Sequence, residues 1–182
     1  PVTLCLVAAA AQAQAASTYI VEGGPGGQHS SSYTDSGFAA SSGLDTEPGC
    51  TATGTRYSGT TTYFGPTRYA QATFSPTTTG YYQIDLSWPS TAGEKATAVN
   101  LYTGAPTGGP TDQWGNPNGP QGVLVSGTMD MYYKNVSTWM NFTTYQLDSG
   151  TPYHVGIYGG YKGDTATENR VAIGGFRFMA AT

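Results

Sequence analysis

The side chains in this sequence that are best suited to hold a ligand are aromatic rather than ionic. The chain has 14 Tyr, 6 Phe and 3 Trp, while only 10% of its 182 residues are charged. Aromatic rings can stack on the apolar faces of sugars, and the same rings can anchor a protein–protein interface. The sequence leaves both uses open. The aromatic residues that we expect to be exposed are Trp114, Tyr81, Tyr158 and Tyr161.

No motif in the chain indicates catalysis. There is no HExxH, GxSxG or CxxC sequence, so no motif supports a zinc hydrolase, a serine hydrolase or thiol redox chemistry. His29 and His154 are isolated, and the parity of His154 is opposite to that of its apolar neighbours, which predicts an outward position. Asp85 and Asp148 fall where solvent-facing strand or turn residues are expected, although a fold can bring distant glycosidase carboxylates together. We therefore expect no enzymatic activity and no catalytic residue.

Three segments rich in side-chain oxygen are candidates for calcium, which prefers such ligands. Aspartate and asparagine also favour turns because they hydrogen-bond to the nearby backbone, and this is the preferred interpretation. We therefore expect no metal site and no cofactor, with calcium as the alternative. The segments are Asp45-Thr46-Glu47, Asp112 with Asn116 and Asn118, and Asp164 with Glu168.

Four residues are candidates for covalent modification. Cys5 and Cys50 are the only cysteines, and they would form a disulfide if the N-terminal segment is kept in an oxidising compartment. Asn135 and Asn141 each begin an Asn-X-Ser/Thr sequence, the acceptor pattern for N-glycosylation. In a chain this rich in Ser and Thr, chance matches to that pattern are expected.

The charge balance argues against a nucleic-acid partner. The chain has 11 acidic and 7 basic residues, which gives a formal net charge of −4. Binding to nucleic acid needs clustered Lys and Arg that neutralise phosphates. A surface with few charges and many tyrosines instead suits stacking and hydrogen bonding, either to sugars or to other copies of the chain.

Residues 1–16 form an apolar, leader-like segment. The run ends in the Ala-Gln-Ala sequence at 13–15, typical of a secretory signal and its cleavage site, so we expect a secreted or cell-surface protein. The run is shorter than the ~20 apolar residues that cross a bilayer, so no membrane span is expected. If the segment is retained, Val2, Leu4 and Leu6 alternate as on a strand that could add to a neighbouring subunit's sheet.

Residues 17–182 predict one all-β domain. Along 80–88, apolar and polar residues alternate as on a half-buried strand. Similar short runs follow with turn signals between them, and no helical periodicity occurs after residue 17. About nine or ten strands predict an antiparallel β-sandwich of jelly-roll type. Residues 104–122 are dense in Gly and Pro and predict a long surface loop.

Two stretches of this pattern are irregular. Residues 28–62 are rich in Ser, Thr and Gly and predict loop with one or two weak strands. Residues 170–179 predict a final strand that is interrupted by Gly174 and Gly175. Because glycine tolerates unusual backbone angles, we expect a β-bulge or the close approach of another group at this pair.

Short motifs follow one another in a recognisable order between residues 19 and 178. They are Tyr19-Ile20-Val21-Glu22, Tyr63-Phe64-Gly65, Arg68-Tyr69-Ala70, Gly80-Tyr81-Tyr82 to Trp88-Pro89, Trp139 with Tyr145, Leu147 and Gly150, and Val171 with Phe176-Arg177-Phe178. This order resembles the golvesin and xanthan-lyase C-terminal type of domain, a secreted β-sandwich module similar to carbohydrate-binding domains. The chain departs from that pattern in its Gly174-Gly175 pair, in Lys134-Asn135 and in the 104–122 insertion. The resemblance implies the fold and supplies no catalytic residue.

The function that the sequence favours is structural and non-enzymatic. We expect a secreted β-sandwich subunit that assembles with copies of itself into an extracellular filament or surface layer, a hypothesis that depends on residues 1–16. The alternative is a carbohydrate-binding module of a secreted or cell-surface protein, with a polysaccharide as its partner. This alternative depends on the family resemblance and on the supply of aromatic side chains.

Overall fold

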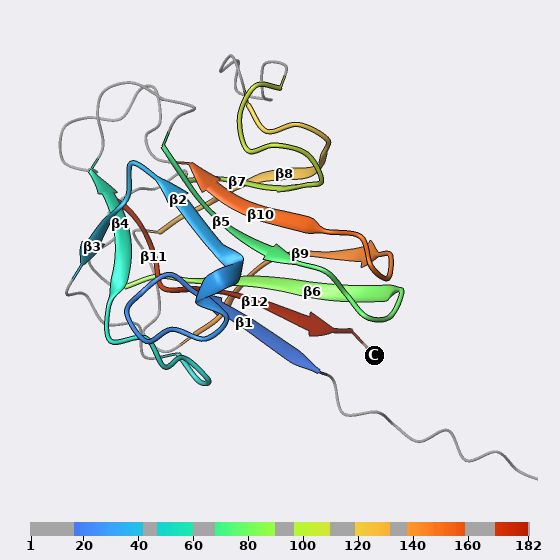
Figure 1. Cartoon of the computed structure of the whole chain (residues 1–182), viewed down its shortest axis with the longest axis horizontal. Helices are drawn as coiled ribbons and strands as arrows, with labels where there is room; N and C mark the ends of the chain where they lie inside the picture. The colour runs from blue at the N-terminus through green and yellow to red at the C-terminus, as the bar shows by residue number, and fades with distance from the viewer. Residues whose placement is uncertain are drawn as a thin grey trace, which may run out of the picture.

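The fold is all-β and antiparallel, as predicted. The computed structural model describes residues 17–41, 47–59, 68–89, 97–109, 119–131, 138–158 and 170–181. The strands in these ranges are β1 (Thr18–Glu22), β2 (Tyr33–Ser36), β3 (Ala39–Ser41), β4 (Thr55–Gly59), β5 (Tyr69–Phe74), β6 (Gly80–Ser87), β7 (Thr97–Tyr102), β8 (Val123–Met129), β9 (Met140–Leu147), β10 (Tyr153–Tyr158), β11 (Arg170–Ile173) and β12 (Gly175–Ala180). A single 3-10 turn, η1 (Ser30–Ser32), precedes β2 (Figure 1). No helix in the described ranges is long and apolar enough to cross a membrane.

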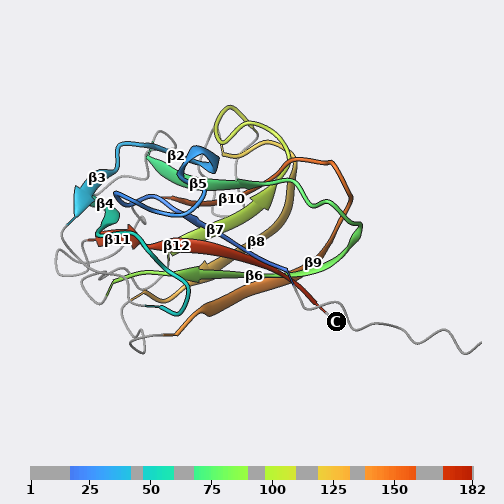
Figure 2. The same cartoon turned by 60° about the horizontal axis from the view of Figure 1, so that its bottom comes forward.

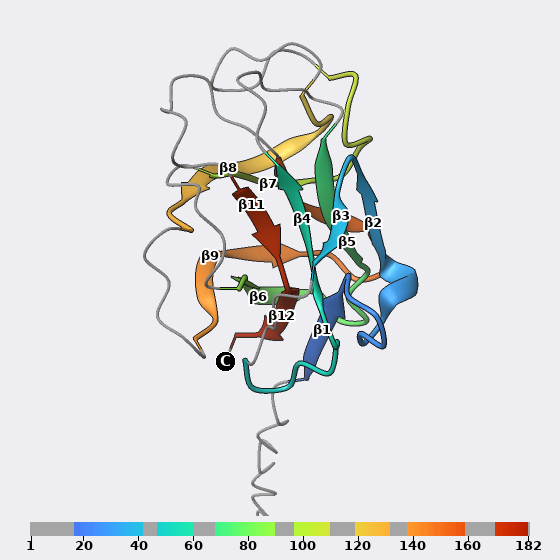
Figure 3. The same ribbon diagram turned by 90° about the vertical axis from the view of Figure 1, so that its left-hand side faces the viewer.

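Two sheets pack face to face, and a small third sheet extends them. The first sheet has the order β1-β12-β6-β9 and the second has the order β2-β5-β10-β7-β8; they form the two layers seen in Figure 2. The third sheet, β11-β4-β3, continues from β12 at one end of the sandwich (Figure 3). Every recorded strand pair is antiparallel, and β6 lies between β12 and β9.

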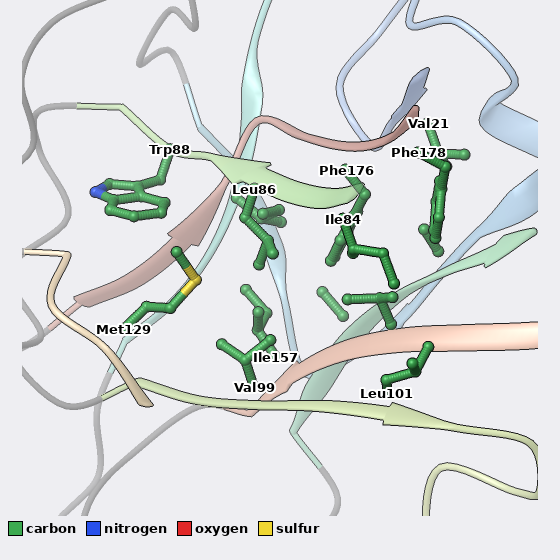
Figure 4. Packing of buried hydrophobic residues seen from close by; sticks show 14 of the residues in the cluster. Val21, Ile84, Leu86, Trp88, Val99, Leu101, Met129, Ile157, Phe176 and Phe178 are labelled. Atoms are coloured by element: carbon green, nitrogen blue, oxygen red, sulfur yellow. The ribbon is translucent and has the colours of Figure 1, made fainter. Parts of the chain in front are cut away.

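The core lies between the two large sheets. Ile84 and Leu86 of β6 and Trp88 just beyond it are buried, as their parity predicts. They face apolar side chains of the second sheet, such as Val99 and Ile157 (Figure 4). The indole N–H of the buried tryptophan donates to a backbone carbonyl at 3.0 Å, so its one polar atom is satisfied.

The irregular stretches contain more strands than the sequence predicts. Residues 28–62 hold β2, β3 and β4 rather than one or two weak strands. They are short, and two of them form the third sheet with β11, so their pairing depends on residues more than 100 positions away. An ion pair assists: the Arg56 guanidinium of β4 donates to both carboxylate oxygens of Asp35 on β2, at 2.8 and 3.2 Å.

The glycine pair at 174–175 marks a corner between two sheets. The chain leaves the third sheet after Ile173, bends at Gly174, and enters the first sheet at Gly175. A Cβ atom on Gly175 would lie 3.2 Å from the ring of Trp139, so this ring packs directly on the glycine backbone. The predicted close approach is therefore confirmed.

A buried carboxylate fastens two loops to β1. Glu22 has no exposed surface, and its side chain accepts hydrogen bonds at 3.0 Å from the backbone N–H groups of Gln28, Thr51 and Ala52 and from the Thr51 hydroxyl. Burial raises the pKa of Glu22, but these donors outweigh it and hold the pKa below its ordinary value. The ionised carboxylate thus ties the 23–28 and 47–53 segments together.

The Glu22→Gln variant is expected to unfold more easily by about 2 kcal/mol at pH 7, because an NH2 group would face backbone N–H donors. A native pKa below the unfolded value means that the wild type loses this contribution as the pH falls from about 4.3 through the native pKa. Denaturant unfolding at a series of pH values measures both effects. The variant should show a flatter acid dependence, and parallel curves would contradict this role of Glu22.

The same pair of loops gives a second stability prediction. A Cβ atom on Gly24 would lie 1.7 Å from the backbone oxygen of Gly54, whereas one on Gly80 would meet nothing within 4 Å. Because backbone cannot rotate away as a side chain can, Gly24→Ala should lower the free energy of unfolding by about 3 kcal/mol. Gly80→Ala is the matched control and should stay within about 0.5 kcal/mol of the wild type in the same thermal or chemical unfolding experiment. Equal stabilities would show that the loops are not packed this closely.

Candidate functional site

An open groove lies at the end of the sandwich where β6 begins and β9 ends. We call it the tyrosine groove, and its volume is about 650 Å³. Its hydrophobic lining comes from Tyr81, Tyr145, Tyr153 and Leu124. Its polar lining comes from Thr103, Thr144, Gln146 and Asp148. These residues come from both large sheets and from the turns at their ends, so the folded sandwich is needed to bring them together.

Tyr81 is the most exposed aromatic side chain of the groove. It lies on β6 with parity opposite to the buried Tyr82, and it is 58% exposed. Its partner across the strand pair is Gln146 of β9, so a ring and an amide share one face of the first sheet. An exposed tyrosine beside an amide offers both a flat apolar surface and hydrogen-bonding groups.

Hydrogen bonds fix the turn that forms one side of the groove. The Tyr153 hydroxyl accepts the backbone N–H of Asp148 at 3.0 Å. The next residue, Ser149, donates its N–H to the Thr79 hydroxyl at 2.9 Å and its own hydroxyl to the Thr77 carbonyl at 2.8 Å. The 148–150 turn is therefore joined to the 75–79 turn, and the groove has a preformed wall.

The chemistry of the groove is that of stacking and neutral hydrogen bonding. Hydroxyl, amide and carboxylate groups surround its three tyrosine rings, and none of its described lining residues is Arg, Lys or His. Such a set can accept and donate hydrogen bonds to hydroxyl groups while a ring packs against C–H groups. It lacks a cation to neutralise an anionic ligand.

The four aromatic residues that were expected to be exposed differ in where the structure places them. Tyr81 is exposed as expected, and it lines the groove. Tyr158 is not exposed: only 5% of its surface is accessible and its hydroxyl donates to the Pro106 carbonyl at 3.3 Å, so that expectation was wrong. This carbonyl belongs to the described part of the 104–122 segment, so that part contacts the tyrosine. Trp114 and Tyr161 lie outside the described residues.

Asp85 is not the solvent-facing residue that the sequence predicts. It is on the outer face of β6, yet its side chain is fully buried. The carboxylate accepts hydrogen bonds from Arg177 Nε at 2.9 Å, Gln83 Nε2 at 2.9 Å and Asn141 Nδ2 at 3.0 Å. A carboxylate that is buried, ion-paired and held by several donors is a structural group rather than an accessible acid or base.

Trp139 contacts the arginine that pairs with this carboxylate and is joined to the 47–50 segment. The Arg177 guanidinium lies 4.7 Å from the centroid of the Trp139 ring, and the indole N–H donates to the Pro48 carbonyl at 3.1 Å. This segment comes from a distant part of the sequence, so strand parity alone could not reveal these contacts.

The two histidines are held locally. The ring of His29 stacks on Tyr19 with centroids 3.9 Å apart, and its Nδ1 lies 2.7 Å from the Ile20 carbonyl. His154 is on the outer face of its sheet, as predicted, and its Nδ1 is hydrogen-bonded to the Thr73 hydroxyl at 2.9 Å. Partial burial lowers the pKa of His154. Among the described residues, the titratable side chain recorded against each imidazole is a tyrosine, Tyr19 for His29 and Tyr102 for His154.

The remaining candidates fall partly within the described residues. Asn141 is exposed, but its amide is the one that donates to Asp85, while Asn135 lies outside the described residues. Cys50 is half-buried, and Cys5 lies outside together with Val2, Leu4 and Leu6. Of the calcium candidates only Glu47 is described, and no group of three or more His, Cys, Asp or Glu in the described ranges could hold a metal ion.

Sequence reasoning missed six of the groove residues, including Thr103 and Thr144. Tyr145 and Tyr153 share the parity of core residues, and Leu124 and Gln146 carry no motif. The available signal was their position at strand ends, beside turn residues such as Asp148. Only the pairing of the strands shows that these ends meet.

Comparisons with known proteins agree with this architecture. No protein-family model matches the chain. A search of curated proteins also finds no match. Among solved structures, a Paenibacillus xanthan lyase is similar over 91% of this chain, with 16% identity and a TM-score of 0.61. A Podospora anserina GH26-CBM35 β-(1,4)-mannanase is also similar over 91% of this chain, with 13% identity and a TM-score of 0.52. A family 35 carbohydrate-binding module from Clostridium thermocellum is similar over 91% of this chain and 99% of its own, with 11% identity and a TM-score of 0.48.

The first two likenesses place the chain among the β-sandwich domains that the sequence motifs resemble. The chain spans 13% of the xanthan lyase chain and 28% of the mannanase chain. At this level of identity they confirm the predicted xanthan-lyase-type, carbohydrate-binding-like fold.

The hydrogen bond beneath the groove can be tested directly. In Tyr153→Phe the ring stays in place but the backbone N–H of Asp148 loses its acceptor, so the free energy of unfolding should fall by about 1 kcal/mol. The amide of Asp148 should also exchange hydrogen faster, while core amides on β6 should not change relative to global stability. Hydrogen exchange followed by NMR measures both. Unchanged exchange at Asp148 would show that the turn does not depend on this bond.

Proposed function

We propose that this chain is a non-catalytic carbohydrate-binding module that holds a polysaccharide in the tyrosine groove. The observation that carries the proposal is the exposed ring of Tyr81 in a groove with two further tyrosines and a polar rim. A tyrosine presents a large rigid surface at low entropic cost, because only two torsions are fixed on binding. Sugar rings have apolar C–H faces and peripheral hydroxyls, which match this arrangement.

The shape of the groove favours the interior of a chain rather than a small enclosed ligand. It is open, and its volume of about 650 Å³ is sufficient for a ligand of several rings. Its walls are attached to the two sheets and to the hydrogen-bonded turns, so little ordering is needed on binding. The fold shared with the two solved structures supports the proposal at the level of architecture.

The absence of catalysis is part of the proposal. The accessible carboxylate of the groove is Asp148, and no second carboxylate lines the groove among the described residues. A glycosidase needs two carboxyl groups that flank the scissile bond. The buried Asp85 is held by Arg177 and cannot supply the second.

Secretion and self-assembly remain separate hypotheses. A secreted or cell-surface location is consistent with binding to polysaccharide, and we include it in the proposal. The filament hypothesis depends on residues 1–16, which lie outside the described residues, and no feature of the described sheets favours it over glycan binding.

The central test is the Tyr81→Ala variant. Removing the ring should weaken binding to responsive polysaccharides by about five- to thirtyfold, because stacking on an exposed aromatic contributes about 1–2 kcal/mol. Tyr81→Phe keeps the ring and should retain most of the affinity. Affinity electrophoresis against mannan, xylan, glucan and xanthan measures the change. Equal retardation of Tyr81→Ala and wild type would contradict a role for this groove.

A second pair of variants separates the groove from general surface hydrophobicity. Leu124 lines the groove and is 39% exposed, whereas the adjacent Val123 is 42% exposed and is not part of the lining. Leu124→Ala should weaken binding severalfold, and Val123→Ala should not. Both variants should retain the wild-type melting temperature within a few degrees. The same loss of binding in both would indicate nonspecific adhesion.

A further inference from the structure

A second hollow lies at the same end of the sandwich, on the other side of the two joined turns. We call it the aromatic pocket, and its volume is about 450 Å³. It is more enclosed than the tyrosine groove. Its aromatic walls are Tyr19 of β1, Phe74 of β5 and Tyr82 of β6, so both large sheets contribute to its lining.

The three rings form one packed group. The Phe74 ring lies 5.2 Å from that of Tyr19 and 5.3 Å from that of Tyr82, measured between centroids, and it stacks on Phe178 of the core at 4.6 Å. The Tyr19 ring is also supported from behind by His29 at 3.9 Å. Because each ring is fixed by another, the walls of the pocket are rigid before any ligand binds.

The rest of the lining consists of hydroxyl groups. Thr18, Ser32, Ser75 and Thr77 are among these residues, and no charged side chain lines the pocket in the described ranges. The Tyr19 hydroxyl bonds to Ser32 at 3.1 Å and the Tyr82 hydroxyl donates to the Thr78 carbonyl at 2.9 Å. A hydroxyl both donates and accepts, so this rim matches a ligand whose own polar groups are hydroxyls.

The pocket and the groove are separate. They share no lining residue, and the consecutive residues Tyr81 and Tyr82 of β6 line one hollow each. Between the hollows, the 75–79 and 148–150 turns are joined by three hydrogen bonds, including the one from the Gly150 N–H to the Pro76 carbonyl at 2.8 Å. Occupation of one hollow therefore does not require movement of the other.

We infer that the aromatic pocket is a second, independent binding site for a neutral sugar residue. The inference rests on the proposed function for the class of ligand, but its site shares no lining residue with the groove. The volume is at the lower end of the range for small-ligand sites, and the enclosed shape suits a chain end or a side-branch residue. A charged sugar is disfavoured because its carboxylate would enter a pocket without a cation.

The experiment is an NMR titration of the whole chain with neutral mannose, xylose and glucose trisaccharides. In the wild type, amide shifts should change in two groups, around Thr77 and Ser32 for the pocket and around Gln146 for the groove, each with its own Kd. Ser75→Trp places an indole in the pocket. This variant should bind at least tenfold more weakly at the pocket, so the first group of shifts should be lost, while the shifts of the groove should remain. Tyr81→Ala should do the reverse. Ser31→Trp, an exposed residue that does not line the pocket, is the matched control.

Each outcome decides between the two sites. Shifts confined to the groove, or loss of both groups in Tyr81→Ala, would overturn the second site and leave the proposed function intact. Shifts confined to the pocket would support the second site and contradict the groove as the binding surface. No shift with any of the three sugars would overturn both. Thr77→Trp provides a second blocking variant if Ser75→Trp has lost its folded amide dispersion.

Discussion

The alternation of side chains between the two faces of β6 is the constraint on which the core and both hollows depend. Ile84 and Leu86 must face the second sheet because their exposure would cost about 1.5–3 kcal/mol each. Once they do, a shift of one residue would exchange every side chain between the two faces. The same requirement sends Tyr82 to the pocket side and Tyr81 to the groove side. The position of the binding surface is therefore a consequence of core packing rather than of a separate recognition element.

Buried ionic groups hold the loops to this core. Glu22 fastens the 23–28 and 47–53 segments through backbone N–H groups, and Asp85 is held by Arg177 beneath Trp139. Burying a carboxylate is costly unless donors surround it, so each site requires a defined loop geometry. The same logic applies, with neutral groups, where the Tyr153 hydroxyl accepts the 148 N–H. These hydrogen bonds hold the loops in a defined position against the core.

The strands were predictable from sequence to the extent that their residues alternate. The all-β class, the buried face of 80–88 and the exposure of Tyr81 follow from local parity. The burial of Asp85 and Tyr158 does not, because it involves groups from distant parts of the sequence: Arg177 and Asn141 donate to the Asp85 carboxylate, and the Pro106 carbonyl accepts from the Tyr158 hydroxyl. The two hollows could not be predicted either. Their lining residues lie at strand ends that come together only through long-range strand pairing.

Under the proposed function, two hollows at one end of the sandwich would act together in binding a glycan. Affinity for a sugar ring is small for each contact, because stacking competes with water and the ligand loses conformational freedom. Preformed walls reduce the ordering cost of each contact. Two sites on one rigid end also let a branched or folded polysaccharide engage a second site at high effective concentration, provided that its geometry spans the joined turns. Under this proposal, the hydrogen bonds between the 75–79 and 148–150 turns set the separation that a bound glycan must match, in addition to joining the two turns.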